Sequence, residues 1–257
     1  QRLADMLDQL ILREGADTIA AFIAEPVMGV GGVIIPPDTY FDKVQEILRH
    51  HDILMIADEV ICGFGRTGNM FGSSTFDIFP DMISLAKGLS SAYAPISALM
   101  ISPEIYETVS NIGETGRGFS HGFTYSGHPV SAAVAEASLR IYEERDICSH
   151  VKNVSKVFQS GLEQLLDHPM VGEIRSIGLM GAVELVANKE SKERFVDELR
   201  VGDEVAAQAE RFGLFVRSVG HSIVIAPPLI ITETEIKDLC NCLDRAIDSV
   251  SKKLSSK

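Results

Sequence analysis

Short, continuous apolar runs alternate with helical segments along this chain, and this alternation restricts the possible folds more than any other feature. Strand-like runs occur at TIAAFIAEP, ILMIADE, DMISLAKG and ISALMIS. Between the first two, residues 37–51 have apolar positions every three or four residues, and Asp38 is expected to cap that helix. The pattern indicates an α/β fold with a largely parallel sheet that is covered on both faces.

The composition changes near residue 146, after the long helical segment VSAAVAEASLRIYEERD. Beyond it we expect a helix, strands at EIRSIG and MGAVELV, a helix, strands near LFVRS and SIVIAPP, and a last helix from Thr234. We therefore predict a large domain in residues 1–146 and a small C-terminal α/β domain in residues 147–257. The chain begins at Gln1 directly in a helical pattern, which indicates a piece of a longer protein.

Composition excludes several classes of function. The formal net charge of −13 argues against a general surface for nucleic acid or anionic membranes. No apolar stretch reaches membrane-spanning length, and no signal-peptide pattern is present. No metal-ligand spacing surrounds His121 or His128, so no metal is expected. The four cysteines lack zinc-like or disulfide-like spacing, which indicates reduced thiols in a cytoplasmic protein.

Two of the apolar runs end on opposite charges. ILMIA is followed by Asp58, and MISLA is followed by Lys87. If these strands are parallel neighbours, both side chains face the crevice where ligands bind in such sheets. A lysine that forms a Schiff base and an aspartate that keeps a pyridine nitrogen protonated are what pyridoxal phosphate requires. The simpler interpretation is a helix cap or salt-bridge partner at Asp58 and a solvated turn at Lys87.

The same residues are compatible with a second class of function. Four apolar residues followed by Asp-Glu also describe the magnesium-binding strand of P-loop ATPases. That function requires a G-x-x-x-x-G-K-[ST] loop, and the chain has none.

At these positions the chain resembles a known family. DEVICGFGRTG followed by SLAKGLSSAYAPI is similar to the signature of class III aminotransferases, which are pyridoxal phosphate enzymes of fold type I. AEPVMGVGG, HGFTYSGHP and RSVGHSIVIAPPLIIT follow the family's order over about residues 20 to 232. Ile61 replaces the Gln of the ornithine-type branch, and the motifs are most similar to ω-amino-acid or amine:pyruvate transaminases.

The resemblance implies roles for the residues around the cofactor. Lys87 would carry pyridoxal phosphate as a Schiff base and move the substrate proton, and Asp58 would pair with the pyridine nitrogen. Val60 would pack on one ring face. Thr124, helped by the backbone near Phe123, would bind the phosphate across a homodimer interface.

The resemblance also implies roles in substrate binding and in holding the loops. Arg217 would recognise substrate carboxylates and swing aside for substrates that lack one. Glu25 would line the pocket or pair with a cation. Arg66 is expected to brace its loop or the dimer. Glu59 should point away from Asp58, because side chains alternate along a strand, and should pair with a loop donor or an arginine.

The implied reaction is a ping-pong transamination from a primary amine or ω-amino acid to a keto acid, with pyruvate as acceptor. A class III relative with other chemistry, such as an aminomutase or racemase, and a non-catalytic fragment stay open as alternatives. The family's chains are much longer at the amino end, so this chain resembles the C-terminal part of the enzyme. The expected partners are small molecules and a second subunit, without nucleic acid or membrane.

Overall fold

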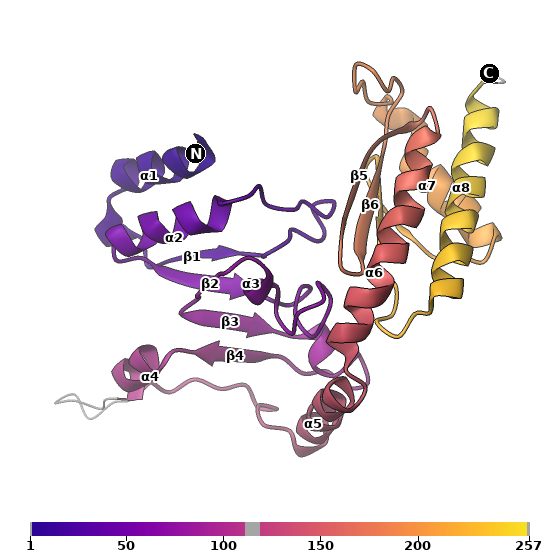
Figure 1. The fold of residues 1–257 in the computed structure, drawn as a ribbon. Coiled ribbons are helices and arrows are strands. Elements are labelled where there is room, and N and C mark those ends of the chain that lie inside the picture. Colours follow the sequence, from indigo (N-terminus) through magenta and orange to yellow (C-terminus); the bar gives the residue numbers. More distant parts are fainter. Residues whose placement is uncertain (1, 111–118, 256–257) are drawn as a thin grey trace. The chain divides into compact units, whose positions relative to one another are not determined.

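The chain forms two compact units in the computed structural model, which describes residues 2–110 and 119–255 (Figure 1). The first unit comprises Gln1–Pro26, Pro36–Phe64 and Asn69–Arg145. The second unit comprises Val27–Ile35, Gly65–Gly68 and Asp146–Lys257. Two glycine-containing loop segments of the amino-terminal half are therefore grouped with the carboxyl-terminal part of the chain. The sequence GETGRGFSHGFTYSGHP predicts a glycine-rich polar loop, and part of it lies outside the described residues.

The first unit is built on a four-stranded sheet whose strands lie side by side in Figure 1 in the order β1-β2-β3-β4. The strands are β1 (Ala21–Ala24), β2 (Leu54–Asp58), β3 (Met82–Leu85) and β4 (Ala98–Ile101). β1 pairs with β2, and β2 with β3, in parallel, whereas β4 joins β3 antiparallel. The predicted α/β class and the largely parallel sheet are confirmed.

Two helices cover one face of this sheet. They are α1 (Arg2–Glu14) and α2 (Tyr40–His50). Ile11 of α1, Val44 and Leu48 of α2, and Met55 of β2 belong to one buried cluster. Removing such apolar side chains from water is the main favourable term for this layer.

The predicted cap of α2 is wrong. The residue before the helix is Thr39 rather than Asp38, and no side chain caps the helix there. Thr39 has a left-handed backbone, with φ of 61°. The amide of Tyr40 is bound instead by the carbonyl of Pro37 at 3.1 Å, so a backbone turn satisfies the donor that a cap would have served.

The prediction that both faces of the sheet are covered is also wrong. Ile23 and Leu99 are each 59% exposed, and both lie on the face opposite the buried cluster. Side chains alternate between faces along a strand, so apolar residues at every position indicate two apolar faces but do not supply a covering layer. In the described ranges, helices bury only the face that carries Met55.

Further helices and 3-10 turns complete the first unit. They are η1 (Ala16–Thr18), α3 (Gly72–Thr75), η2 (Lys87–Leu89), α4 (Pro103–Ser110) and α5 (Pro129–Glu144).

The second unit packs helices on an antiparallel sheet of order β5-β6-β8-β7. Its strands are β5 (Val171–Ile177), β6 (Met180–Leu185), β7 (Arg217–Val219) and β8 (Ser222–Ile225). Its helices are α6 (Ile147–Glu163), η3 (Gln164–Asp167), η4 (Asp197–Leu199), α7 (Val201–Arg211) and α8 (Glu233–Ser255). Helix α8 contacts α6 and α7, while α6 contacts β5 and β6 and α7 contacts β7 and β8. The order of helices and strands predicted for this half is confirmed.

All four cysteines are free thiols. Burial raises the pKa of the Cys240 thiol to about 11, which keeps it protonated and unreactive at neutral pH. In the part of the chain that the structure describes, no helix has both the length and the apolar composition to cross a membrane.

Candidate active site

Three of the predicted site residues, Glu25, Asp58 and Lys87, lie at or just after the ends of adjacent strands, at one edge of the first sheet. In the parallel pairing of β1 and β2, Ala24 lies beside Ala57, so Glu25 and Asp58 come next to each other along the register. Asp58 in turn lies beside Ser84 of β3, and Lys87 is the third residue after Ser84. The carboxyl edge of a parallel sheet is where ligands bind in α/β folds.

Asp58 is held by two donors on one of its carboxylate oxygens. Its Oδ1 accepts hydrogen bonds from the Val60 backbone N–H at 3.0 Å and from the Ser84 hydroxyl at 3.1 Å. In the described part of the chain, no hydrogen bond reaches Oδ2, and Asp58 is only half-buried. A carboxylate that is held in one orientation, with Oδ2 not bonded to any described residue, can accept a hydrogen bond from the cationic N–H of a protonated pyridine ring.

Lys87 opens a short 3-10 turn on an unusual backbone. Its φ of 41° lies in the left-handed region, which favours glycine. Its side chain is exposed, and its ammonium makes no ion pair or hydrogen bond with any residue that the structure describes. An amine that no other group engages fits reaction with the aldehyde of pyridoxal phosphate.

Glu59 points away from this edge, as predicted from strand alternation. The side chain is fully buried and accepts hydrogen bonds from the backbone N–H groups of Gly72 at 2.8 Å and Ser73 at 2.6 Å. A buried carboxylate is costly unless donors satisfy it, and these two amides at the start of α3 do so. The loop donor expected for Glu59 is therefore a pair of backbone amides. Its adjacent acid, Asp58, remains at the sheet edge.

The remaining predicted residues of the first unit occupy different surroundings. Val60 is half-buried beside Asp58, to which it gives its N–H. Phe123 and Thr124 lie in an exposed turn, where the Phe123 N–H is bound by the Ser126 hydroxyl at 2.9 Å. In the described ranges neither side chain bonds to Asp58 or Lys87. The structure thus brings Glu25, Asp58, Val60 and Lys87 to one edge and leaves the turn at residues 123–127 exposed.

The second unit contains the two arginines that the sequence singled out. Arg217 is the first residue of β7, opposite Val224 of β8, and its side chain is exposed. Arg66 donates to the carbonyls of Leu179 at 3.1 Å and Pro227 at 2.6 Å. Arg66 therefore braces its loop, as expected.

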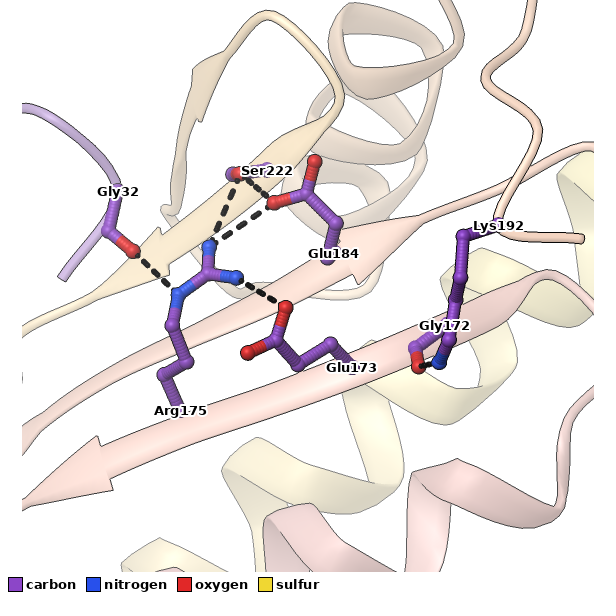
Figure 2. A network of polar contacts seen from close by, with 7 residues as sticks. All are labelled: Gly32, Gly172, Glu173, Arg175, Glu184, Lys192 and Ser222. Atoms are coloured by element: carbon purple, nitrogen blue, oxygen red, sulfur yellow. Dashed lines mark hydrogen bonds and ion pairs between the residues drawn. The ribbon is translucent and has the colours of Figure 1, made fainter. Parts of the chain in front are cut away.

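Sequence reasoning missed a third arginine, which holds the loop after β1 (Figure 2). Arg175 of β5 donates from Nε to the carbonyl of Gly32 at 2.9 Å. Its other nitrogens bind the carboxylates of Glu173 and Glu184, both at 2.9 Å, and Ser222 also donates to Glu184. Gly32 has φ of 109°, so the loop needs glycine there. EIRSIG carried no signal for the bond to Gly32, because that carbonyl is distant in sequence.

The family is shown by comparison with known proteins. The family described as aminotransferase class-III matches residues 1–247. The chain belongs to this family. It is 49% identical to gamma aminobutyrate transaminase 1, mitochondrial, of Solanum lycopersicum over 253 residues, which cover 98% of this chain and 49% of that protein. It is also 49% identical to vanillin aminotransferase of Capsicum frutescens over 253 residues, with 98% and 55% covered.

Solved structures of transaminases have the same fold as this aminotransferase chain. The ω-transaminase of Pseudomonas jessenii in complex with PMP superposes with a TM-score of 0.96 at 46% identity, covering 99% of this chain and 56% of that one. A transaminase with L-Ala superposes with a TM-score of 0.95 at 46% identity, covering 98% and 60%. The chain spans about half the length of the curated relatives it matches. Pyridoxal phosphate is the cofactor of the family.

The ion pair of Arg175 predicts a pH-dependent stability. Burial raises the pKa of Glu184, but hydrogen bonds from Ser222 and Arg175 outweigh it and hold that pKa below the usual 4.5. A carboxylate whose pKa is lowered in the folded state stabilises that state fully at pH values above 4.5. The stabilisation is lost as the pH falls through the lowered, folded-state pKa. Glu184→Gln should remove this part of the acid sensitivity and cost about 1–3 kcal/mol at neutral pH.

Urea unfolding at a series of pH values would check this prediction. Glu173→Gln is the matched control, because it also removes a carboxylate from Arg175 but one that is 56% exposed, and a smaller loss is expected. Identical acid sensitivity in Glu184→Gln and the unmodified protein would contradict the prediction.

Proposed function

We propose that this chain carries the lysine and the pyridine-binding aspartate of a pyridoxal phosphate-dependent transaminase. The enzyme moves an amino group from a primary amine or ω-amino acid to a keto acid, with pyruvate as acceptor, in a ping-pong reaction. One observation carries the proposal: Asp58 ends β2 and Lys87 follows the adjacent parallel strand β3, and no described residue bonds to Asp58 Oδ2 or to the Lys87 amine.

Bound pyridoxal phosphate supplies an aldehyde and a ring that can take up the electrons of a substrate C–H bond. Asp58 keeps a proton on the pyridine nitrogen, and Ser84 and the Val60 amide orient its carboxylate for this. Lys87 would hold the cofactor through its amine, with loss of water from the aldehyde, and would move the proton at the substrate carbon. Val60 would pack on one face of the ring.

Other residues of the chain bind the phosphate and the substrate. Thr124 and the backbone near Phe123 hold the phosphate of the partner subunit's cofactor, so two copies share the sites of a homodimer. The exposure of this turn supports a contact outside the subunit. Arg217 binds the keto acid carboxylate by a bidentate pair, and Glu25 lines the amine side.

The names of the relatives support the substrate class. Gamma aminobutyrate carries its amine at the opposite end from its carboxylate, and a vanillin aminotransferase acts on an aldehyde or its amine. An arginine that engages a carboxylate or moves aside for substrates without one suits both kinds of molecule.

Two further parts of the proposal concern organisation and location. We assign residues 1–146 to the cofactor-binding large domain and residues 147–257 to the small domain. We also place the enzyme in the cytoplasm, on the ground of its free thiols. Some relatives carry mitochondrial or chloroplastic in their names, so fractionation of the source cells is the test of location.

The lysine is tested first. In the full protein encoded by the gene, Lys87→Ala should abolish the absorbance of the covalent lysine–cofactor bond and the adduct that borohydride fixes, because no other amine replaces it. Transamination should fall by about a thousandfold or more. Peptide mapping after reduction locates the adduct, and Lys237→Ala, an exposed lysine of α8, is the control. A borohydride-fixed adduct that survives Lys87→Ala would refute the proposal.

Asp58→Asn tests the charge separately from the geometry. The amide oxygen can still accept from Val60 and Ser84, whereas the amide nitrogen cannot hold a proton on the pyridine ring. The variant should therefore keep the covalent adduct on Lys87 but turn over about 10²- to 10³-fold more slowly. The measurement is kcat beside the absorbance spectrum, and a near-normal kcat would remove Asp58 from this role.

Arg217→Ala separates the two half-reactions. The keto acid half-reaction should lose about ten- to a hundredfold in kcat/KM, because the carboxylate loses a charged partner. A simple amine donor should lose much less. Single-turnover kinetics of each half-reaction give both values, with Arg211→Ala on the exposed end of α7 as control. Equal losses for both substrates would argue against carboxylate binding by Arg217.

A further inference from the structure

The turn that carries Lys87 adopts a backbone that its residues do not favour. Lys87, Ser91 and Ala92 have φ values of 41°, 50° and 64°, although none is a glycine. Left-handed backbone is unfavourable for such residues and persists only where the surroundings hold it. Local backbone hydrogen bonds close part of this turn: Leu89 N–H reaches the Ala86 carbonyl at 2.9 Å, and Ser90 N–H and Ser91 N–H reach the carbonyls of Lys87 and Gly88 at 3.3 Å.

A tyrosine from a distant helix holds the middle of this turn. Tyr142 of α5 donates its hydroxyl to the carbonyl of Gly88 at 2.9 Å and is only 9% exposed. Its ring stacks on Phe64, with centroids 6.0 Å apart and planes at 26°. A Cβ on Gly88 would lie 2.9 Å from Phe64 Cβ, so Gly88 is fixed between the Phe64 side chain and the Tyr142 hydroxyl.

Counting protons gives the direction of the hydrogen bonds that extend from Tyr142. The single hydroxyl proton of Tyr142 is committed to Gly88, so in the 2.9 Å contact with Ser91 the serine must donate. Ser91 has then used its proton, and in the 3.2 Å contact Ser138 must donate to Ser91. A chain of donors therefore runs from Ser138 through Ser91 and Tyr142 to the backbone beside Lys87.

We propose that Tyr142 is a positioning residue, which acts through the Gly88 carbonyl to hold Lys87 where its amine reaches the cofactor aldehyde. The inference rests on the proposed role of Lys87. The lysine side chain is long and flexible, so its reach depends on a fixed backbone. The close approach of Phe64 and the Tyr142 hydrogen bond both act on Gly88, the residue directly after Lys87.

The test compares two forms of the cofactor on the full protein. Pyridoxal phosphate can bond covalently to Lys87, whereas pyridoxamine phosphate carries an amine in place of the aldehyde and cannot. A residue that positions Lys87 should therefore affect affinity for the first form and not for the second. Tyr142→Phe keeps the stacked ring and removes the hydroxyl. We expect its Kd for pyridoxal phosphate to rise about three- to tenfold, with the Kd for pyridoxamine phosphate within about twofold.

Matched variants define the controls. Ser138→Ala removes only the first donor of the chain, the one farthest from Gly88. It should raise the Kd for pyridoxal phosphate by less than about twofold. Tyr106→Phe, at a tyrosine of α4 that is 61% exposed, should change neither Kd. If Tyr142→Phe fails to fold, Ser91→Ala takes its place, because it removes the donor to Tyr142 and leaves the Gly88 bond, with a smaller rise expected.

The outcomes separate this inference from the proposed function. Equal weakening of both cofactor forms by Tyr142→Phe, or no weakening of either, would overturn the positioning role. In a Lys87→Ala background the proposal requires that Tyr142→Phe have no further effect on either Kd. If Lys87→Ala itself leaves the preference for pyridoxal phosphate over pyridoxamine phosphate unchanged, the proposed function fails instead.

Discussion

The parallel pairing of β2 with β3 is the constraint on which the candidate site depends. Strands that run in the same direction end at the same edge, so the residues that follow them are brought together without any contact between their side chains. The register then sets Ser84 beside Asp58, close enough for its hydroxyl to orient the carboxylate. The same strand continues into the turn that presents Lys87.

The two adjacent acids show how one strand end serves two purposes. Alternation of side chains sends Glu59 inward, where two backbone amides at the start of α3 satisfy its buried carboxylate. Asp58 faces the opposite side with one oxygen unbound by any described residue. The inward acid anchors the loop that follows β2, and the outward acid is left for a ligand.

Loops in both units depend on contacts with distant side chains. In the first unit, Tyr142 holds the carbonyl of Gly88 in the turn beside Lys87. In the second, Arg175 holds the carbonyl of Gly32 while two carboxylates neutralise its charge (Figure 2). At both places a glycine allows close approach or a left-handed backbone, and a polar side chain from a later element fixes the carbonyl. Irregular backbone is thus stabilised from outside the loop.

The sequence by itself determined the order of helices and strands, the α/β class and the charged residues at the strand ends. These depend on local periodicity and on side-chain alternation, which are readable over a few residues. The opposite directions of Asp58 and Glu59 followed from the same alternation. The family's motifs supplied the candidate roles of the site residues.

Only the tertiary structure decided which groups hold these residues in place. The Asp38 cap, expected from local chemistry, was displaced by a backbone turn at Thr39. The sheet face that carries Ile23 is left open in the described ranges, although its apolar pattern predicted a cover. The contacts of Tyr142 and Arg175 join residues far apart in the chain. The loop groups that they hold, Gly88 and Gly32, are backbone carbonyls, which every residue possesses, so no pattern of side chains along the sequence could have shown these two bonds.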